Sequence, residues 1–203
     1  MTYKSILNEE SINSFRKKCI DDLNEHINLN SNNCSYIIDG KVLDMVLLTD
    51  NMINDSKLIS YIKSNDCGAI STFYGTTRDN FEGKLVQNLS YEAYDLMALE
   101  EMMGVVTRLR SKWDIKRIIM CHKKGDCPVG ETSVFIAISS PHRTEALHAT
   151  EYAINELKAK VPIWKKEIYD TGDSTWKVNK EQSKNTFYKF EQEQQGQQEV
   201  DQI

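Results

Sequence analysis

The sequence lacks the features that mark membrane, secreted and nucleotide-driven proteins. Its longest uninterrupted apolar run, Val134 to Ile138, is far shorter than the roughly 20 residues of a membrane-spanning helix. The N-terminal segment has no apolar core like that of a secretory signal and soon becomes acidic, which also argues against a transit peptide. No glycine-rich phosphate loop of the Walker or Rossmann type occurs. We therefore expect a cytosolic protein that does not bind membranes and does not use nucleotide-driven chemistry.

Proline and positive charge are also scarce. The chain has 203 residues with three prolines, 40% hydrophobic and 27% charged residues, which is typical of one globular domain with appendages. Its 25 Lys and Arg stand against 30 Asp and Glu, which gives a formal net charge of −5. Because general nucleic-acid binders need basic surfaces, we expect no nucleic-acid partner, and any anion site must be a local exception.

The cysteines lack a pairing pattern. They are Cys19, Cys34, Cys67, Cys121 and Cys127. No CxxC pair occurs, which argues against a disulfide framework and against a four-thiolate zinc site. Cys121, His122 and Cys127 have metal-ligand residue types, but no fourth ligand stands at a recognised spacing. We expect buried reduced thiols, no metal and no other cofactor.

Composition divides the chain into three parts. Residues 9–27 have apolar positions at helical spacing and predict an amphipathic helix, which the Asn-rich segment 28–33 ends. We assign residues 1–44 to an N-terminal appendage and residues 45–180 to the main domain. The Gln-rich residues 181–203 offer almost nothing to bury and are expected to form a disordered tail.

The main domain alternates strand and helix patterns. Strands are predicted from Met45 and over residues 68–78, 85–94, 115–122, 132–139 and 163–168, and helices over 55–64, 96–113 and from about 140 to 160. Turn formers between the segments 68–78 and 85–94 favour a hairpin of these two strands. The order implies an α+β fold with helices packed on a mostly antiparallel sheet.

The start of the last helix carries two cations. Ser140 can serve as the N-cap with Pro141 at the first helical position, which places His142 and Arg143 in the first turn. Free backbone N–H groups at a helix N-terminus attract anions, so this pair indicates a phosphate or carboxylate site. The alternative is that both side chains simply reach solvent or pair with Glu145.

Lysines lie at and beyond the end of the same helix. Lys158 is in the last turn, where it also stabilises the helix dipole, and Lys165 is on an extended segment after Pro162. Lysine chemistry needs a pKa lowered from about 10.4 toward neutrality by burial or by neighbouring positive charge. The cations that could supply this, if the fold gathers them, are Arg78, Arg143, Lys158, Lys165 and Lys166. Spacing alone does not show that they meet.

Four motifs stand in a characteristic order along the chain. They are residues 68–84 (GAISTFYGTTRDNFEGK), 89–94 (LSYEAY), 139–143 (SSPHR) and 157–167 (LKAKVPIWKKE). Together they resemble the large, catalytic subunit of the molybdopterin synthase family over roughly residues 45–177. The loop at residues 81–84 is similar to that of the eukaryotic members.

This resemblance implies a sulfurtransferase of molybdenum cofactor biosynthesis. The family converts cyclic pyranopterin monophosphate into molybdopterin, forming a dithiolene with sulfur from the C-terminal thiocarboxylate of a small ubiquitin-like subunit. It implies a homodimer of large subunits within a heterotetramer, in which each site receives one Gly-Gly tail. It also implies an α/β-hammerhead fold with a barrel-like antiparallel sheet subdomain, so that residues 45–180 form the catalytic domain.

The same resemblance assigns roles residue by residue. It implies that Lys158 and Lys165 are catalytic. It implies that substrate is bound by Arg78, His142, Arg143, Lys158, Lys165, Lys166 and Glu167. A cationic pocket suits both anionic reactants, the cyclic phosphate and the thiocarboxylate. Because the sulfur arrives on the partner's tail, none of the five cysteines needs to be catalytic.

Two other function classes are compatible with the residues. A non-catalytic adaptor would dock a ubiquitin-like tail without turnover. Another lysine-dependent enzyme on an anionic substrate, such as an aldolase-like Schiff-base former, would form an imine that borohydride traps.

Overall fold

The computed structural model describes residues 34–39 and 42–177. The predicted helix at residues 9–27, the Asn-rich segment 28–33 and the Gln-rich tail lie outside the described residues, and the extents of the three parts of the chain stay predictions. Within the described ranges no helix is both long enough and apolar enough to cross a membrane.

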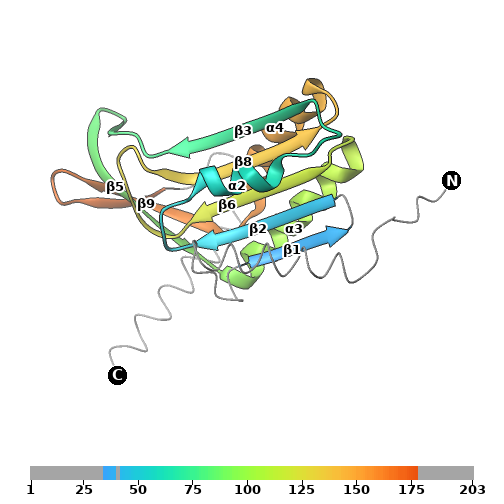
Figure 1. Ribbon diagram of the computed structural model, residues 1–203. Coiled ribbons are helices and arrows are strands. Elements are labelled where there is room, and N and C mark those ends of the chain that lie inside the picture. The colour runs from blue at the N-terminus through green and yellow to red at the C-terminus, as the bar shows by residue number, and fades with distance from the viewer. Residues whose placement is uncertain (1–33, 40–41, 178–203) are drawn as a thin grey trace.

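A five-stranded sheet forms the centre of the molecule (Figure 1). In spatial order its strands are β1 (Cys34–Asp39), β2 (Val42–Thr49), β6 (Arg117–Lys123), β8 (Thr132–Ser140) and β3 (Ala69–Thr76). Strands β2 and β6 are parallel, and the other neighbours are antiparallel. The expected first strand thus begins three residues earlier than Met45, and β1 adds a strand that the sequence did not predict.

Helices cover both faces of this sheet (Figure 1). They are α2 (Asp55–Ile62) on one face and α3 (Asp95–Lys112) with α4 (Arg143–Lys160) on the other. Along β2, Met45 and Leu47 pack in the cluster with α2, whereas Val46 and Leu48 pack in the cluster with α3 and α4. Burial on both faces explains why β2 is an uninterrupted apolar run rather than an alternating one.

A second, antiparallel sheet curls away from one end of the first (Figure 1). Its strands are β10 (Ser174–Lys177), β9 (Ile163–Tyr169), β5 (Lys84–Ala93) and β4 (Asn80–Phe81), and β7 (Gly125–Pro128) also pairs with β5. A small core of Val86, Leu89, Cys127 and Tyr169 supports it. This curled sheet is the barrel-like subdomain, and the expected α+β architecture with helices packed on a sheet is confirmed.

The expected hairpin of segments 68–78 and 85–94 is wrong. β3 pairs with β8, and the tight turn at Glu82 and Gly83 joins only the short β4 to β5. Both turn residues have positive φ, 49° and 80°, as two-residue hairpins require. β3 ends before this turn because Thr77 is held by the neighbouring loop: its N–H donates to Glu131, and its carbonyl accepts from Gly130.

The predicted N-cap of the last helix is also wrong. Ser140 remains in β8, where its hydroxyl donates to the Asp114 carbonyl at 2.9 Å. His142 occupies the N-cap position without a side-chain capping bond, and Arg143 is the first helical residue. Ser140 therefore stays in the strand instead of capping the helix, because its pairing with Ala69 continues to the end of β8.

Candidate active site

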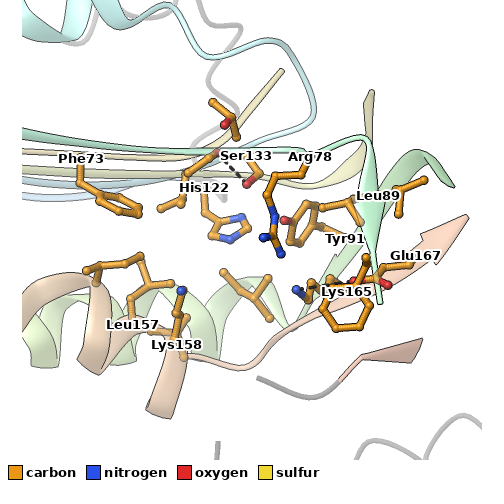
Figure 2. Close-up of a pocket in the computed structure, with 18 of the residues that line it drawn as sticks. Phe73, Arg78, Leu89, Tyr91, His122, Ser133, Leu157, Lys158, Lys165 and Glu167 are labelled. Atoms are coloured by element: carbon orange, nitrogen blue, oxygen red, sulfur yellow. Dashed lines mark hydrogen bonds and ion pairs between the residues drawn. The ribbon is translucent and has the colours of Figure 1, made fainter. Parts of the chain in front are cut away.

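A cavity of about 280 Å³ lies between the two sheets and the C-terminal end of α4 (Figure 2). The first sheet contributes residues of β3, β6 and β8, among them Phe73, His122 and Ser133. The second sheet contributes residues of β4, β5 and β9, and α4 contributes Ile154, Leu157 and Lys158. The volume is just below the roughly 300–1,000 Å³ of typical ligand clefts, so a small ligand or the narrow end of a larger one fits.

Arg78 reaches this cavity because β3 is interrupted next to it. One residue of β8, Ser133, has no partner where Gly75 and Thr76 pair with Val134 and Thr132, which is a β-bulge. A Cβ on Gly75 would lie 2.4 Å from a methyl of Val134, so only glycine fits there. The bulge turns Ser133 into the cavity and ends the strand, and the chain then presents Arg78 at the cavity's edge.

Lys158 and Lys165 come from two elements that meet where α4 ends. Leu157 is buried in the main core and fixes the last turn that carries Lys158. Pro162 ends the helix, and its carbonyl accepts the N–H of Tyr94, so the following strand β9 is tied to the start of α3. Lys165 lies on β9 opposite Tyr91 of β5, and both line the cavity (Figure 2).

The surroundings of Lys165 lower its pKa. Burial is the largest cause, because a desolvated ammonium is disfavoured. Glu167 opposes this effect, whereas the positive charges of Lys158, Arg78 and Lys177 add to it. Lowering a lysine pKa in this way requires that the fold brings the cations together, and it does so for Arg78, Lys158 and Lys165. A lysine with a lowered pKa can exchange a proton or act as a nucleophile more readily than a free one.

Glu167 is the buried counter-charge of the cavity. Its side chain is 3% exposed, and the Tyr169 hydroxyl donates to it at 2.9 Å. The ammonium groups of Lys165 and Lys177 both lie 3.9 Å from its carboxylate. Lys177 also lies over the ring of Phe81 at 4.5 Å, which connects β10 to the β4 side of the cavity. Glu167 therefore holds two lysines on one face of the second sheet.

Polar groups also line the cavity away from these cations. Figure 2 shows His122 and Ser133 on the side of the first sheet, and the ring of Tyr91, from β5, packs against His122. From the sequence, His122 was considered only as a metal-ligand residue type without a complete ligand set, and its place in the cavity was not predicted. Alternation along β6 could have found it, because His122 shares the face of Ile118 and Met120, which pack toward α3 and α4. Cys121 faces α2 instead, and the described residues contain no cluster of three or more candidate metal ligands.

Comparison with known proteins decides the family. A family model described as "MoaE protein" matches residues 48–160, more than half of the chain. The chain belongs to the MoaE family. The molybdopterin synthase catalytic subunit of Homo sapiens is 49% identical over 144 residues, which cover 71% of this chain and 76% of that protein.

Other relatives agree with this assignment to the MoaE family. The molybdopterin synthase catalytic subunit of Drosophila melanogaster is 54% identical over 141 residues, which are 68% of this chain and 38% of that protein. The chain thus spans well under half the length of the fruit-fly relative. The solved molybdopterin synthase from Staphylococcus aureus has a TM-score of 0.61 at 33% identity and covers 64% of this chain and 94% of that chain.

The cavity collects four of the seven residues that the resemblance to the molybdopterin synthase family suggested. Arg78, Lys158, Lys165 and Glu167 line it. Lys166 points to the other face of β9, where its ammonium lies 5.8 Å from the centre of the Trp176 ring.

His142 and Arg143 lie at the opposite end of α4 from the cavity. Both are exposed, and neither lines the cavity of its own chain. Fifteen residues of helix separate Arg143 from Lys158, which is about 22 Å at 1.5 Å per residue. One chain therefore presents two separate groups of cations.

Proposed function

We propose that this chain is the catalytic subunit of a molybdopterin synthase. It transfers sulfur from the thiocarboxylated C-terminus of a small ubiquitin-like subunit to cyclic pyranopterin monophosphate and so forms the dithiolene of molybdopterin. The observation that carries the proposal is the convergence of Arg78, Lys158 and Lys165 on one cavity, each from a different element. The names of the relatives support it, as does the small volume of the cavity, which suits the narrow tail of a Gly-Gly terminus.

The basic residues of the cavity have two proposed roles, which are anion binding and proton transfer or covalent attachment. Arg78 anchors an anionic group, since its guanidinium can hold a phosphate or carboxylate through two hydrogen bonds. Lys158 and Lys165 position the thiocarboxylate and act as acid, base or point of covalent attachment while sulfur attacks the pterin side chain. The lowered pKa of Lys165 favours a share of neutral amine for this chemistry.

The two cation groups at the ends of α4 support a dimeric site. If His142 and Arg143 bind the same substrate as Lys165, a second copy of the chain must supply them, because about 22 Å of helix separates them within one chain. This requirement agrees with the homodimer within a heterotetramer that the family resemblance implies. We include the homodimer, the small subunit and substrate binding by His142, Arg143 and Lys166 in the proposal.

Reconstitution tests the reaction itself. Purified chain, thiocarboxylated small subunit and cyclic pyranopterin monophosphate should yield molybdopterin, measured as its fluorescent oxidised derivative. The variant Lys158→Ala with Lys165→Ala should abolish dithiolene formation. Lys160→Ala is the matched control, since Lys160 lies on the same helix end but pairs with Glu156 outside the cavity.

The outcomes separate the candidate functions. Full dithiolene formation by the double variant would refute the assignment of the lysines. Tail binding without any pterin turnover by the unmodified chain would favour the adaptor. A borohydride-trapped imine with a carbonyl substrate would favour a Schiff-base enzyme.

Mixing a variant impaired in turnover with one impaired in substrate binding tests the shared site, at a pterin concentration well below KM. One dimer carries Lys165→Ala and the other carries Arg143→Ala with His142→Ala. After subunit exchange, half of the dimers are mixed and each has one intact site, so roughly a quarter of the unmodified activity should return. If subunit exchange is verified and no activity returns, one site does not combine Lys165 of one subunit with His142 and Arg143 of the other.

A further inference from the structure

One part of the cavity is lined by neutral polar groups that include a fixed hydrogen-bond acceptor. We call His122, Tyr91 and Ser133 the acceptor floor, and Arg78, Lys158 and Lys165 the cationic rim. Both sets line the same cavity, and Figure 2 shows Lys158 and Lys165 across it from His122 and Ser133. The rim explains how an anion is held, but it leaves the floor without a role.

The tautomer of His122 follows from its backbone contact. Its Nδ1 lies 2.7 Å from the carbonyl oxygen of Lys123. A carbonyl can only accept, so Nδ1 carries the proton and Nε2 keeps a free lone pair. The side chain is 5% exposed, and its ring points into the cavity (Figure 2). His122 therefore offers a fixed acceptor to whatever occupies the cavity.

Tyr91 adds a neutral phenol next to this acceptor. The Ser133 hydroxyl donates its single proton to the carbonyl of Gly75 at 3.0 Å. Tyr91 lies beside Ser133 in the same cavity, and a neutral phenol can both accept and donate a hydrogen bond. The phenol oxygen keeps its lone pairs, and the Tyr91 ring packs edge-on against His122 with centroids 4.9 Å apart.

Both groups stay uncharged at neutral pH. Burial lowers the pKa of His122 to about 4 and is the largest cause that raises the pKa of Tyr91 to about 12. The charged groups that line the same cavity are the cationic rim and Glu167. An imidazole with so low a pKa is a poor general base at neutral pH, so its contribution is to accept a hydrogen bond.

We propose that the acceptor floor binds an amide-type N–H of the ligand whose anionic group the cationic rim holds. An anion would meet the Nε2 lone pair of His122, a cation would be repelled by the rim, and an apolar group would leave this buried acceptor unpaired. This inference rests on the proposed function, which offers two sources of such an N–H. They are the backbone amides of the Gly-Gly tail and the ring N–H groups of the pterin.

Two substitutions at one position isolate the acceptor. His122→Leu introduces an apolar side chain of similar size and removes the lone pair of Nε2. His122→Gln can instead place an amide oxygen near the position of Nε2. Calorimetric titration is performed with the small subunit in its carboxylate form and, separately, with cyclic pyranopterin monophosphate. We expect His122→Leu to weaken one of the two affinities about three- to tenfold and His122→Gln to restore most of it.

A modified tail peptide tests directly whether the tail's backbone N–H groups bind the acceptor floor. A peptide with the small subunit's C-terminal sequence is compared with one that carries N-methylglycine at the last two positions, which removes both N–H groups. If the floor binds the tail, N-methylation should weaken binding to the unmodified chain but have little further effect on His122→Leu. If the pterin is the donor, only the pterin affinity should depend on His122.

Tyr91→Phe provides a second variant in case His122→Leu does not fold. It preserves the edge-on packing, removes the phenol oxygen, and should weaken the same arm by a smaller factor. Unchanged affinity for both probes in folded His122→Leu and Tyr91→Phe would overturn the inference and leave the proposed function intact. Failure of the unmodified chain to bind either probe would instead overturn the proposed function.

Discussion

The two ends of helix α4 carry similar charges in different surroundings. At the N-terminal end, His142 and Arg143 are exposed on the surface. At the C-terminal end, Lys158 joins Lys165 and Arg78 around a cavity walled by two sheets. The pKa of Lys165 falls because desolvation and like charges act together at the cavity. An exposed cation can bind an anion, whereas a lysine in such a cavity can also gain or lose its own proton near neutral pH more readily.

The largest expected effect comes from removing the chemistry at the cavity end. Lys165→Met should lower the turnover of the reconstituted synthase by at least about 100-fold, as is typical when a proton-transfer group is lost. Lys160→Met, at the same helix end but outside the cavity, should change turnover less than about twofold. Single-turnover formation of molybdopterin measures both. Equal losses in the two variants would show that general charge at this end is what matters.

A smaller effect is expected at the exposed end. Arg143→Ala should raise KM for the pterin monophosphate about tenfold with little change in kcat, because an exposed guanidinium contributes binding rather than proton transfer. The increase should shrink at high salt, since exposed charges are screened. Initial rates over a range of substrate and salt concentrations test this. A fall in kcat as large as that of Lys165→Met would remove the distinction between the ends.

Two glycines near the ends of β3 test the packing behind each cation group. A Cβ on Gly75 would lie 2.4 Å from Val134 beside the cavity, and a Cβ on Gly68 would lie 2.9 Å from the Pro141 carbonyl beside His142. Each substitution by alanine should lower the free energy of unfolding by about 1–3 kcal/mol, the usual cost of overpacking. Denaturant unfolding measures the cost. Only Gly75→Ala should also perturb tail binding, so equal effects on tail binding would contradict the separation of the two groups.

The smallest effects are shifts in the titration of Lys165. Glu167→Gln removes the charge that raises the pKa of Lys165, so this pKa should fall further. Lys177→Gln removes a charge that lowers it, so the pKa should rise. NMR titration of ¹³C-labelled lysine side chains follows both shifts. If neutral Lys165 is the active form, the acidic limb of the rate profile should move to lower pH in the first variant and to higher pH in the second. Shifts of the same sign would mean that rearrangement, rather than charge, controls the group.

Much of the fold was predictable because its patterns are local. Helix α3 was predicted within one residue at each end, since apolar spacing and the sheet beneath it agree. The segment after Pro162 was correctly predicted as extended. The hairpin was wrong because turn residues specify a reversal of the chain but not which strands continue beyond it. Strand β1 was missed because its six residues directly follow the Asn-rich segment and were assigned to the N-terminal appendage.

The candidate site was only partly predictable. Family motifs indicated the lysines and Arg78, whose residue types suggest anion binding in any context. His122 was missed as a cavity residue because its meaning depends on which face of β6 it occupies and on the cavity beyond that face. The family motif grouped Lys166 with Lys165, although neighbouring residues of a strand point to opposite faces.

The sequence by itself determined the helices and most strands of the main domain, the order of the motifs, and the charge of the residues that serve them. The tertiary structure alone decided which cations meet. Helix spacing places Arg143 and Lys158 on one element, yet the length of that element keeps them about 22 Å apart. Arg78 and Lys165 lie 87 positions apart in the sequence and still share one cavity, because a bulge and a curled sheet bring their strands together. Burial, which changes the pKa values of Lys165 and His122, exists only once those elements pack.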